Sequence, residues 1–190
     1  MSRAACWPLE AGLALAVAAC ATAPPAETGH APVSDAPFAI DGRLSARHGS
    51  EAIAIGFAWT HAPPRDELVV SNPLGQAVAE LSGDSSLRRV EMRTANGGRE
   101  EASDWPALTE RALGVALPVG ALASWTQGIP RVDATHTVEF DAAGRSKVLR
   151  QDGCEIVYTY PDDSTRRPSR MTAACFDLEM RVVIDRWRTL

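Results

Sequence analysis

The chain has 190 residues, 45% hydrophobic and 23% charged, which is the composition of an ordinary globular protein that can bury one core. Its 24 acidic and 19 basic residues give a net charge of -5, and no cluster of Lys or Arg could neutralise a row of phosphates. The composition therefore predicts one folded domain and argues against nucleic acid as a partner.

The N-terminal segment is typical of a signal peptide that ends at a lipidation site. The apolar run from Ala11 to Ala19 is too short to span a bilayer as a helix. It ends in Val17-Ala18-Ala19-Cys20, which resembles a lipobox, where the cysteine thiol is lipidated and the preceding peptide is cut. We therefore expect residues 1–19 to be a signal peptide and Cys20 to carry the lipid. The alternative is an ordinary cysteine that is buried or removed by cleavage.

The residues after the cysteine predict the location of the protein and the reach of its tether. Ala21 stands where an aspartate would retain a lipoprotein in the inner membrane, so the outer membrane is the expected location. Residues 20–37 are rich in Ala, Pro, Thr and Ser and show no periodicity, which is typical of a solvated tether. We expect the folded domain, residues 38–190, to face the periplasm at the end of this tether.

The first part of the domain is predicted to be a meander of strands. Hydrophobic residues alternate with polar ones, which is the period of a half-buried strand, and turn sequences separate the runs. Asn72-Pro73-Leu74-Gly75 and Asn96-Gly97-Gly98 are two such turns. The expected strands are 38–46, 53–59, 68–70, 78–82, 87–92 and 99–102.

Two short helices are expected next, because the hydrophobic period changes. Ser103 or Asp104 can cap the first helix, and Gly114 ends it. Pro118 suits the first turn of the second helix, and 128–130 stops it. Strands then resume at 137–140, 147–152, 155–160, 171–174 and 178–187. We therefore predict a mainly β fold, an antiparallel and incompletely closed barrel with a lid of short helices.

The sequence contains no pattern that indicates catalysis or a metal site. The four histidines, His30, His48, His61 and His136, are scattered and have no clustered cysteine or carboxylate partners. No nucleophile elbow, phosphate-binding glycine loop or nucleotide fingerprint is present. We therefore expect a binding protein with no cofactor rather than an enzyme.

A series of short motifs along the domain resembles the LolB family. No single motif is specific to the family, but the order of the motifs together with the preceding lipobox is specific. One difference is Cys154, where the family commonly has tryptophan. The motifs are Phe57-x-Trp59, Asn72-Pro73-Leu74-Gly75, Leu113-Gly114 with Leu117-Pro118, Leu122-x-x-Trp125-x-x-Gly128-Ile129-Pro130, Gln151-x-Gly153 with Val157-Tyr158, and Val183-Ile184-Asp185-Arg186-Trp187.

The resemblance implies an outer-membrane lipoprotein that receives other lipoproteins from the periplasmic carrier LolA and inserts them into the membrane. It implies an unclosed barrel with a helical lid and an apolar cavity for acyl chains, in a protein expected to be monomeric. In the family, the leucine of the Asn-Pro-Leu-Gly loop projects and is needed for insertion, which corresponds to Leu74. The expected cavity residues are Phe57, Trp59, Leu113, Leu117, Leu122, Trp125 and Val157.

Two other functions remain open from the sequence. A soluble carrier of the LolA type would share the fold and the ligand but would lack the lipobox. A structural envelope lipoprotein would have a solidly packed barrel, in which the aromatic residues are core and bind no lipid.

The register of two late strands predicts a disulfide. If 155–160 and 171–174 pair about a loop centred between Ser164 and Thr165, then Cys154 and Cys175 fall opposite each other. The periplasm permits their oxidation. The alternative is a pair of small buried apolar residues.

Overall fold

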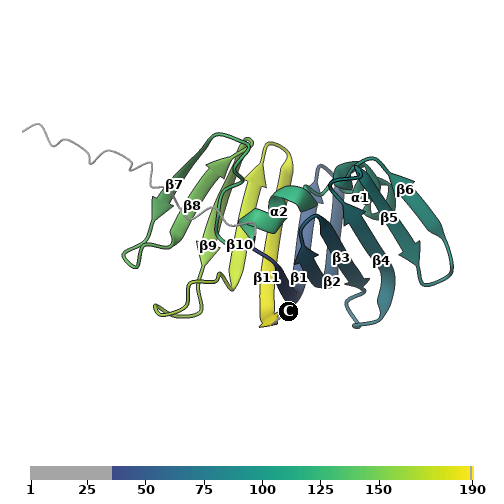
Figure 1. The fold of residues 1–190 in the computed structure, drawn as a ribbon, viewed down its shortest axis with the longest axis horizontal. Coiled ribbons are helices and arrows are strands. Elements are labelled where there is room, and N and C mark those ends of the chain that lie inside the picture. The colour runs from purple at the N-terminus through teal and green to yellow at the C-terminus, as the bar shows by residue number, and fades with distance from the viewer. Residues whose placement is uncertain (1–35, 189) are drawn as a thin grey trace, which may run out of the picture.

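The computed structural model describes residues 36–188 and Leu190, and this part of the chain forms one antiparallel sheet of 11 strands with two helices (Figure 1). The predicted signal peptide, Cys20 and the tether up to residue 35 lie outside the described residues. The elements are β1 Phe38–His48, β2 Glu51–Ala62, β3 Arg65–Ser71, β4 Ala77–Asp84, β5 Arg89–Thr94, β6 Arg99–Ala102, α1 Trp105–Leu113, α2 Val119–Trp125, β7 His136–Phe140, β8 Ser146–Gln151, β9 Cys154–Thr159, β10 Arg170–Cys175 and β11 Leu178–Arg188.

The strand order is β6-β5-β4-β3-β2-β1-β11-β10-β9-β8-β7, so the first and last strands of the domain pair at the centre. β6 and β7 form the two edges and do not pair with each other within the described residues. The sheet is therefore an unclosed antiparallel barrel, which confirms the predicted fold class.

Alternation of buried and exposed residues explains why these segments form strands. In β1, Leu44 and Ala46 are buried while Arg43, Ser45 and Arg47 are exposed. β9 repeats the pattern, with Cys154, Ile156 and Tyr158 buried and the residues between them exposed. Because side chains on a strand alternate between faces, every second residue contributes to one inner face.

The start of β5 differs from the prediction. Leu87 was expected in the strand, but β5 begins at Arg89 and Leu87 lies in a turn with its side chain 69% exposed. The Asp84 carboxylate accepts hydrogen bonds from the backbone N–H groups of Ser86 and Leu87. This side-chain bonding competes with strand pairing and delays the start of β5.

The helix boundaries follow the capping signals. The Asp104 carboxylate accepts the N–H of Ala107 at 2.9 Å, which caps α1. Gly114 adopts φ 77°, a left-handed conformation that ends the helix. α2 follows Pro118 and buries Val119, Leu122 and Trp125.

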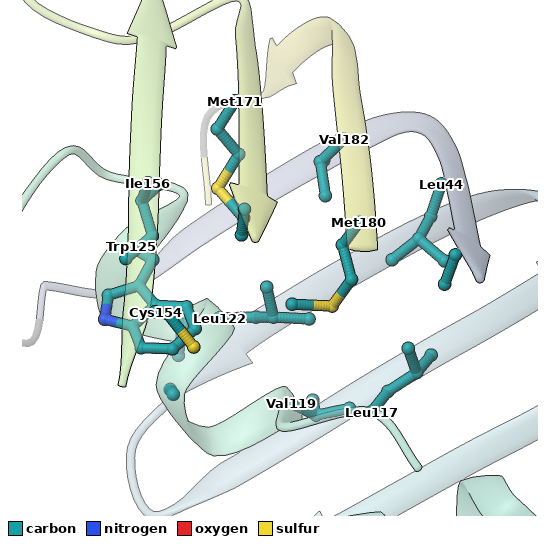
Figure 2. Close-up of a cluster of buried hydrophobic side chains, with 14 of the residues drawn as sticks. Leu44, Leu117, Val119, Leu122, Trp125, Cys154, Ile156, Met171, Met180 and Val182 are labelled. Atoms are coloured by element: carbon teal, nitrogen blue, oxygen red, sulfur yellow. The ribbon is translucent and has the colours of Figure 1, made fainter. Parts of the chain in front are cut away.

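The helices contribute to a core on the inner face of the sheet. Side chains from α2 and the preceding loop pack among residues of β1, β9, β10 and β11, and Leu122 lies near Met180 (Figure 2). A smaller cluster lies where Leu108 of α1 packs with Leu81, Val90 and Met92 of β4 and β5. Neither helix is long and apolar enough to cross a membrane, in the part of the chain that is described.

Candidate functional site

An apolar cavity lies between the two helices and the inner face of the sheet. Its walls come from β1 to β4 and β11 on one side and from α1, the connecting loop and α2 on the other. The lining residues are Leu44, Ile55, Phe57, Trp59, Leu68, Val70, Leu81, Thr109, Leu113, Leu117, Val119, Leu122, Thr126 and Val182. The two threonine hydroxyls donate to backbone carbonyls of their own helices, so the lining has no unsatisfied side chain and suits an apolar ligand.

Hydrogen bonds hold the Trp59 ring in the cavity wall. Its indole N–H donates to the buried Asp66 carboxylate at 2.8 Å, and Nδ1 of His61 lies 2.7 Å from the same oxygen. Phe38 packs edge-on against Trp59, with ring centroids 5.0 Å apart. The polar end of the ring is thus satisfied, and its apolar surface can form part of the cavity wall.

Two sets of hydrogen bonds fix the lid, which consists of α1 and α2. The first is at the loop that connects these helices. The buried Thr109 hydroxyl accepts the N–H of Leu117 at 2.7 Å and donates to the carbonyl of Trp105 at 2.9 Å. One side chain therefore ties the loop before α2 to the middle of α1.

The second contact is at the end of α2, where Gln151 of β8 makes four hydrogen bonds. Its carbonyl oxygen accepts the indole N–H of Trp125 at 3.0 Å and the N–H of Arg131 at 2.9 Å. Its amide nitrogen donates to the carbonyls of Arg131 and Ala134. Nearby, the Ser146 hydroxyl donates to the carbonyl of Gly128 at 2.6 Å. The chain after α2 is thereby fastened to the sheet.

The cavity is small in this conformation, with a volume of about 40 Å³. Sites for drug-sized ligands are typically about 300–1,000 Å³. Binding of a ligand of that size therefore requires side chains of α1 and α2 to move away from the sheet.

Five of the seven predicted cavity residues lie in the lining: Phe57, Trp59, Leu113, Leu117 and Leu122. The other two require correction. Val157 is 40% exposed and lines a groove on the outer face, because its position in β9 alternates with the inward Ile156 and Tyr158. Trp125 is 1% exposed and does not line the cavity; it lies buried beside Gln151.

Sequence reasoning missed several lining residues. Leu44, Ile55, Leu68 and Val70 lie on the same alternating faces as the residues that were predicted, so strand periodicity could have identified them. Thr109 had no such signal, because its role depends on a backbone N–H eight residues later.

Leu74 stands at the tip of the β3–β4 hairpin with its side chain 86% exposed, as predicted. The Asn72 side-chain oxygen accepts the N–H groups of Leu74 and Gln76, at 2.9 and 3.1 Å. Gly75 has φ 82°, which favours glycine, and its N–H donates to the Asn72 carbonyl. Asn72, Pro73 and Gly75 thus define a turn that holds the leucine outward.

Cys154 and Cys175 are joined by a disulfide in the structure, with the sulfur atoms 2.09 Å apart. The two residues are direct partners in the β9–β10 ladder, so the predicted register is confirmed. The bond links the two strands at the end that is remote from the loop between them.

No group of three or more His, Cys, Asp or Glu residues within the described part of the chain is placed to hold a metal ion. The geometry that the structure does offer is an apolar cavity under two helices and an exposed leucine on a rigid turn.

Comparison with known proteins places the chain in a family. The family described as Outer membrane lipoprotein LolB matches residues 36–187. An outer-membrane lipoprotein LolB from Azoarcus sp. (strain BH72) is 36% identical over 177 residues, covering 92% of this chain and 90% of the relative. A second, from Thiobacillus denitrificans, is 34% identical and covers 94% of this chain and 95% of the relative.

Among solved structures, a LolA superfamily protein from Nitrosomonas europaea is similar, with a TM-score of 0.49, 10% identity, and coverage of 83% of this chain and 89% of that chain. The family match and the identity with the relatives extend over nearly all of the described domain. This chain therefore belongs to the LolB family of outer-membrane lipoproteins.

Proposed function

We propose that this chain is held in the outer membrane by a lipid on Cys20, receives lipoproteins from a LolA-type carrier and inserts them into the membrane. The observation that carries the insertion step is the 86% exposure of Leu74 on a turn that hydrogen bonds hold in shape. Family membership supports the cargo and the carrier, and the apolar lining of the cavity supports acyl chains as its ligand.

Acylated proteins need an apolar container to cross water. Each buried methylene contributes about 0.8 kcal/mol, so a protein with two or three acyl chains does not leave a membrane unaided. A cavity lined by leucine, isoleucine, valine and aromatic side chains replaces the hydrocarbon. The protein therefore acts by binding, and the reaction forms or breaks no covalent bond.

Cargo transfer requires the lid to open and must proceed downhill, because the periplasm has no ATP. The cargo passes from a weaker site on the carrier to a tighter site here and then to the bilayer. Among the described residues, the contacts of Thr109 and Gln151 lie before and after α2, and the middle of α2 packs on the sheet through apolar side chains. Acyl chains can replace that packing with similar apolar contacts as α2 moves. We expect one copy of the chain to suffice.

Leu74 promotes release by entering the bilayer. Burial of its side chain in the hydrocarbon contributes a favourable free energy of about 1.5–3 kcal/mol, enough to favour contact with the bilayer but too little to anchor the protein. A carboxylate at the same position resists the apolar interior. We expect Leu74→Glu to accept cargo normally from the carrier while transferring it to liposomes roughly tenfold more slowly or worse.

Leu87→Glu is the matched control. Leu87 is also an exposed leucine in a hairpin turn, at the opposite ends of the strands, and its side chain is 69% exposed. The control should transfer cargo at the parental rate. Parental transfer by Leu74→Glu, or equal defects in both variants, would contradict the role of Leu74. Failure of a fluorescent fatty-acyl probe to bind the parent would instead favour a packed structural barrel.

A further inference from the structure

A cluster of arginines lies on the outer face of the sheet, on the side opposite the cavity. Arg43 of β1 and Arg170 of β10 are both ladder partners of Val183 in β11. Arg181 lies two residues before Val183 and therefore on the same face. All three arginines are exposed. Three neighbouring strands thus carry three guanidinium groups around one valine.

Positive charge exceeds negative charge in this cluster. Arg43 forms an ion pair with Asp185, at 2.7 Å. Arg170 and Arg181 have no ion-pair partner among the described residues. Glu179 lies two residues before Arg181 on the same face and is paired with Arg47. With that pair included, this face has four cations and two carboxylates, although the whole chain has a net charge of -5.

The arginine cluster borders a groove that reaches the Leu74 turn. Arg43, Ser45 and Arg181 line the groove together with Pro73 and Gly75, the two residues that flank Leu74. The groove is open because the residues at its base, such as Ala54 and Gly56, have small side chains. The groove has a volume of about 500 Å³, large enough for the polar headgroup of a lipid.

We propose that this groove binds the phosphate of an anionic phospholipid while Leu74 enters the hydrocarbon beneath it. The proposal rests on the proposed membrane contact of Leu74. When the leucine side chain enters the acyl region, the adjacent arginines lie at the depth of the phosphates, where arginine can donate two parallel hydrogen bonds. A protein of net negative charge is repelled by an anionic surface, so a local basic groove selects the face that approaches the membrane.

The test uses the mature lipidated protein carrying Leu74→Cys labelled with an environment-sensitive fluorophore. In the mature protein as proposed, Cys6 is removed with the signal peptide and the Cys20 thiol carries the lipid. Cys154 and Cys175 are bonded to each other, so the label attaches at one position. The protein is reconstituted into phosphatidylcholine vesicles with or without phosphatidylglycerol, and lipid-borne quenchers report insertion of the label. We expect phosphatidylglycerol to increase insertion and salt to reverse the increase.

Arg181→Gln should reduce the phosphatidylglycerol-dependent increase about fivefold, the effect of one cation at a membrane surface. Arg170 lies on β10, beyond the residues that line the groove, so Arg170→Gln should have a smaller effect. Arg88→Gln is the matched control, because it removes the same charge from an exposed arginine in the β4–β5 turn, which lies at the other end of β4 from the Leu74 turn. It should leave the increase unchanged. Circular dichroism confirms that each variant is folded.

Three results would overturn the proposal. Insertion that is equal in both kinds of vesicle would reject the lipid site and leave the role of Leu74 intact. A label that enters neither kind of vesicle would reject both. An Arg181→Gln variant that keeps the lipid dependence but loses acceptance from the carrier would show that the groove binds an acidic protein surface instead.

Discussion

Four hydrogen bonds of Gln151 attach the end of α2 and the segment that follows it to β8, and a substitution at Gln151 tests this attachment directly. Gln151→Leu keeps a side chain of similar size but removes both the donor and the acceptor. The indole N–H of Trp125, the N–H of Arg131 and the carbonyls of Arg131 and Ala134 each lose a partner. The substitution therefore acts on the segment that follows α2 without creating a large void.

The expected loss of stability follows from burial. A buried polar group left without a hydrogen bond costs about 1–3 kcal/mol. Trp125 is 1% exposed, so its indole N–H bears this cost in full, whereas Arg131 and Ala134 are only partly buried and bear less of it. After the apolar gain of leucine, we expect a net loss of about 2–4 kcal/mol, or a decrease in Tm of about 5–15 °C.

Urea unfolding and calorimetry measure this loss, and binding of a fluorescent fatty-acyl probe measures access to the cavity. The variant should bind the probe faster because α2 is less firmly held. Gln127→Leu is the control, since the side-chain amide of Gln127 donates only to the Ala123 carbonyl of α2, the helix that precedes it. A free energy of unfolding for Gln151→Leu within about 0.5 kcal/mol of the parent would refute the reasoning.

Three further predictions concern the disulfide, the tyrosines and the cavity. Non-reducing mass spectrometry should find Cys154 and Cys175 bonded, and replacing both by serine should cost about 3 kcal/mol in urea unfolding, because the bond closes a loop with a sequence separation of 21. Burial and the Asp141 carboxylate raise the pKa of Tyr160 to about 12, and burial also raises the pKa of Tyr158. These are the two tyrosines of the chain, so absorbance should detect no tyrosinate between about pH 10 and 11. Because the folded pKa exceeds the unfolded value, the stabilisation is present below about pH 10 and is lost as pH rises through 12. Leu113→Trp should fill the cavity, so we expect a clear loss of affinity for an acyl probe with only a small decrease in Tm. An affinity equal to that of the parent would place the ligand elsewhere.

Most of the fold could be predicted from local sequence. Alternation in segments such as Phe57-x-Trp59 identified the strands, because side chains of a strand point to opposite faces in turn. Asp104 and Gly114 marked the ends of α1, because capping depends on a few neighbouring residues. The ladder that places Cys154 opposite Cys175 followed from counting outward from one loop.

The exposed position of Leu74 was also available from the sequence, since an Asn-Pro-Leu-Gly turn is built from its own hydrogen bonds. Its contact with a bilayer is a property of the assembly with the membrane, and the family resemblance supplied that expectation. The turn and its role were therefore predicted from different sources.

Tertiary structure decided which apolar residues face the cavity and which are core. Trp125 and Leu122 lie on the same face of α2 by helical spacing. Trp125 is nevertheless buried in the core, where its indole N–H donates to Gln151, a residue 26 positions later in the sequence. Val157 lies outside because the pairing register sets the face of the whole of β9, and a shift by one residue reverses every side chain. The arginine cluster depends on the pairing of β1 with β11, the two strands farthest apart in the sequence. Local patterns determine the elements, whereas contacts between distant segments determine which surfaces those elements build.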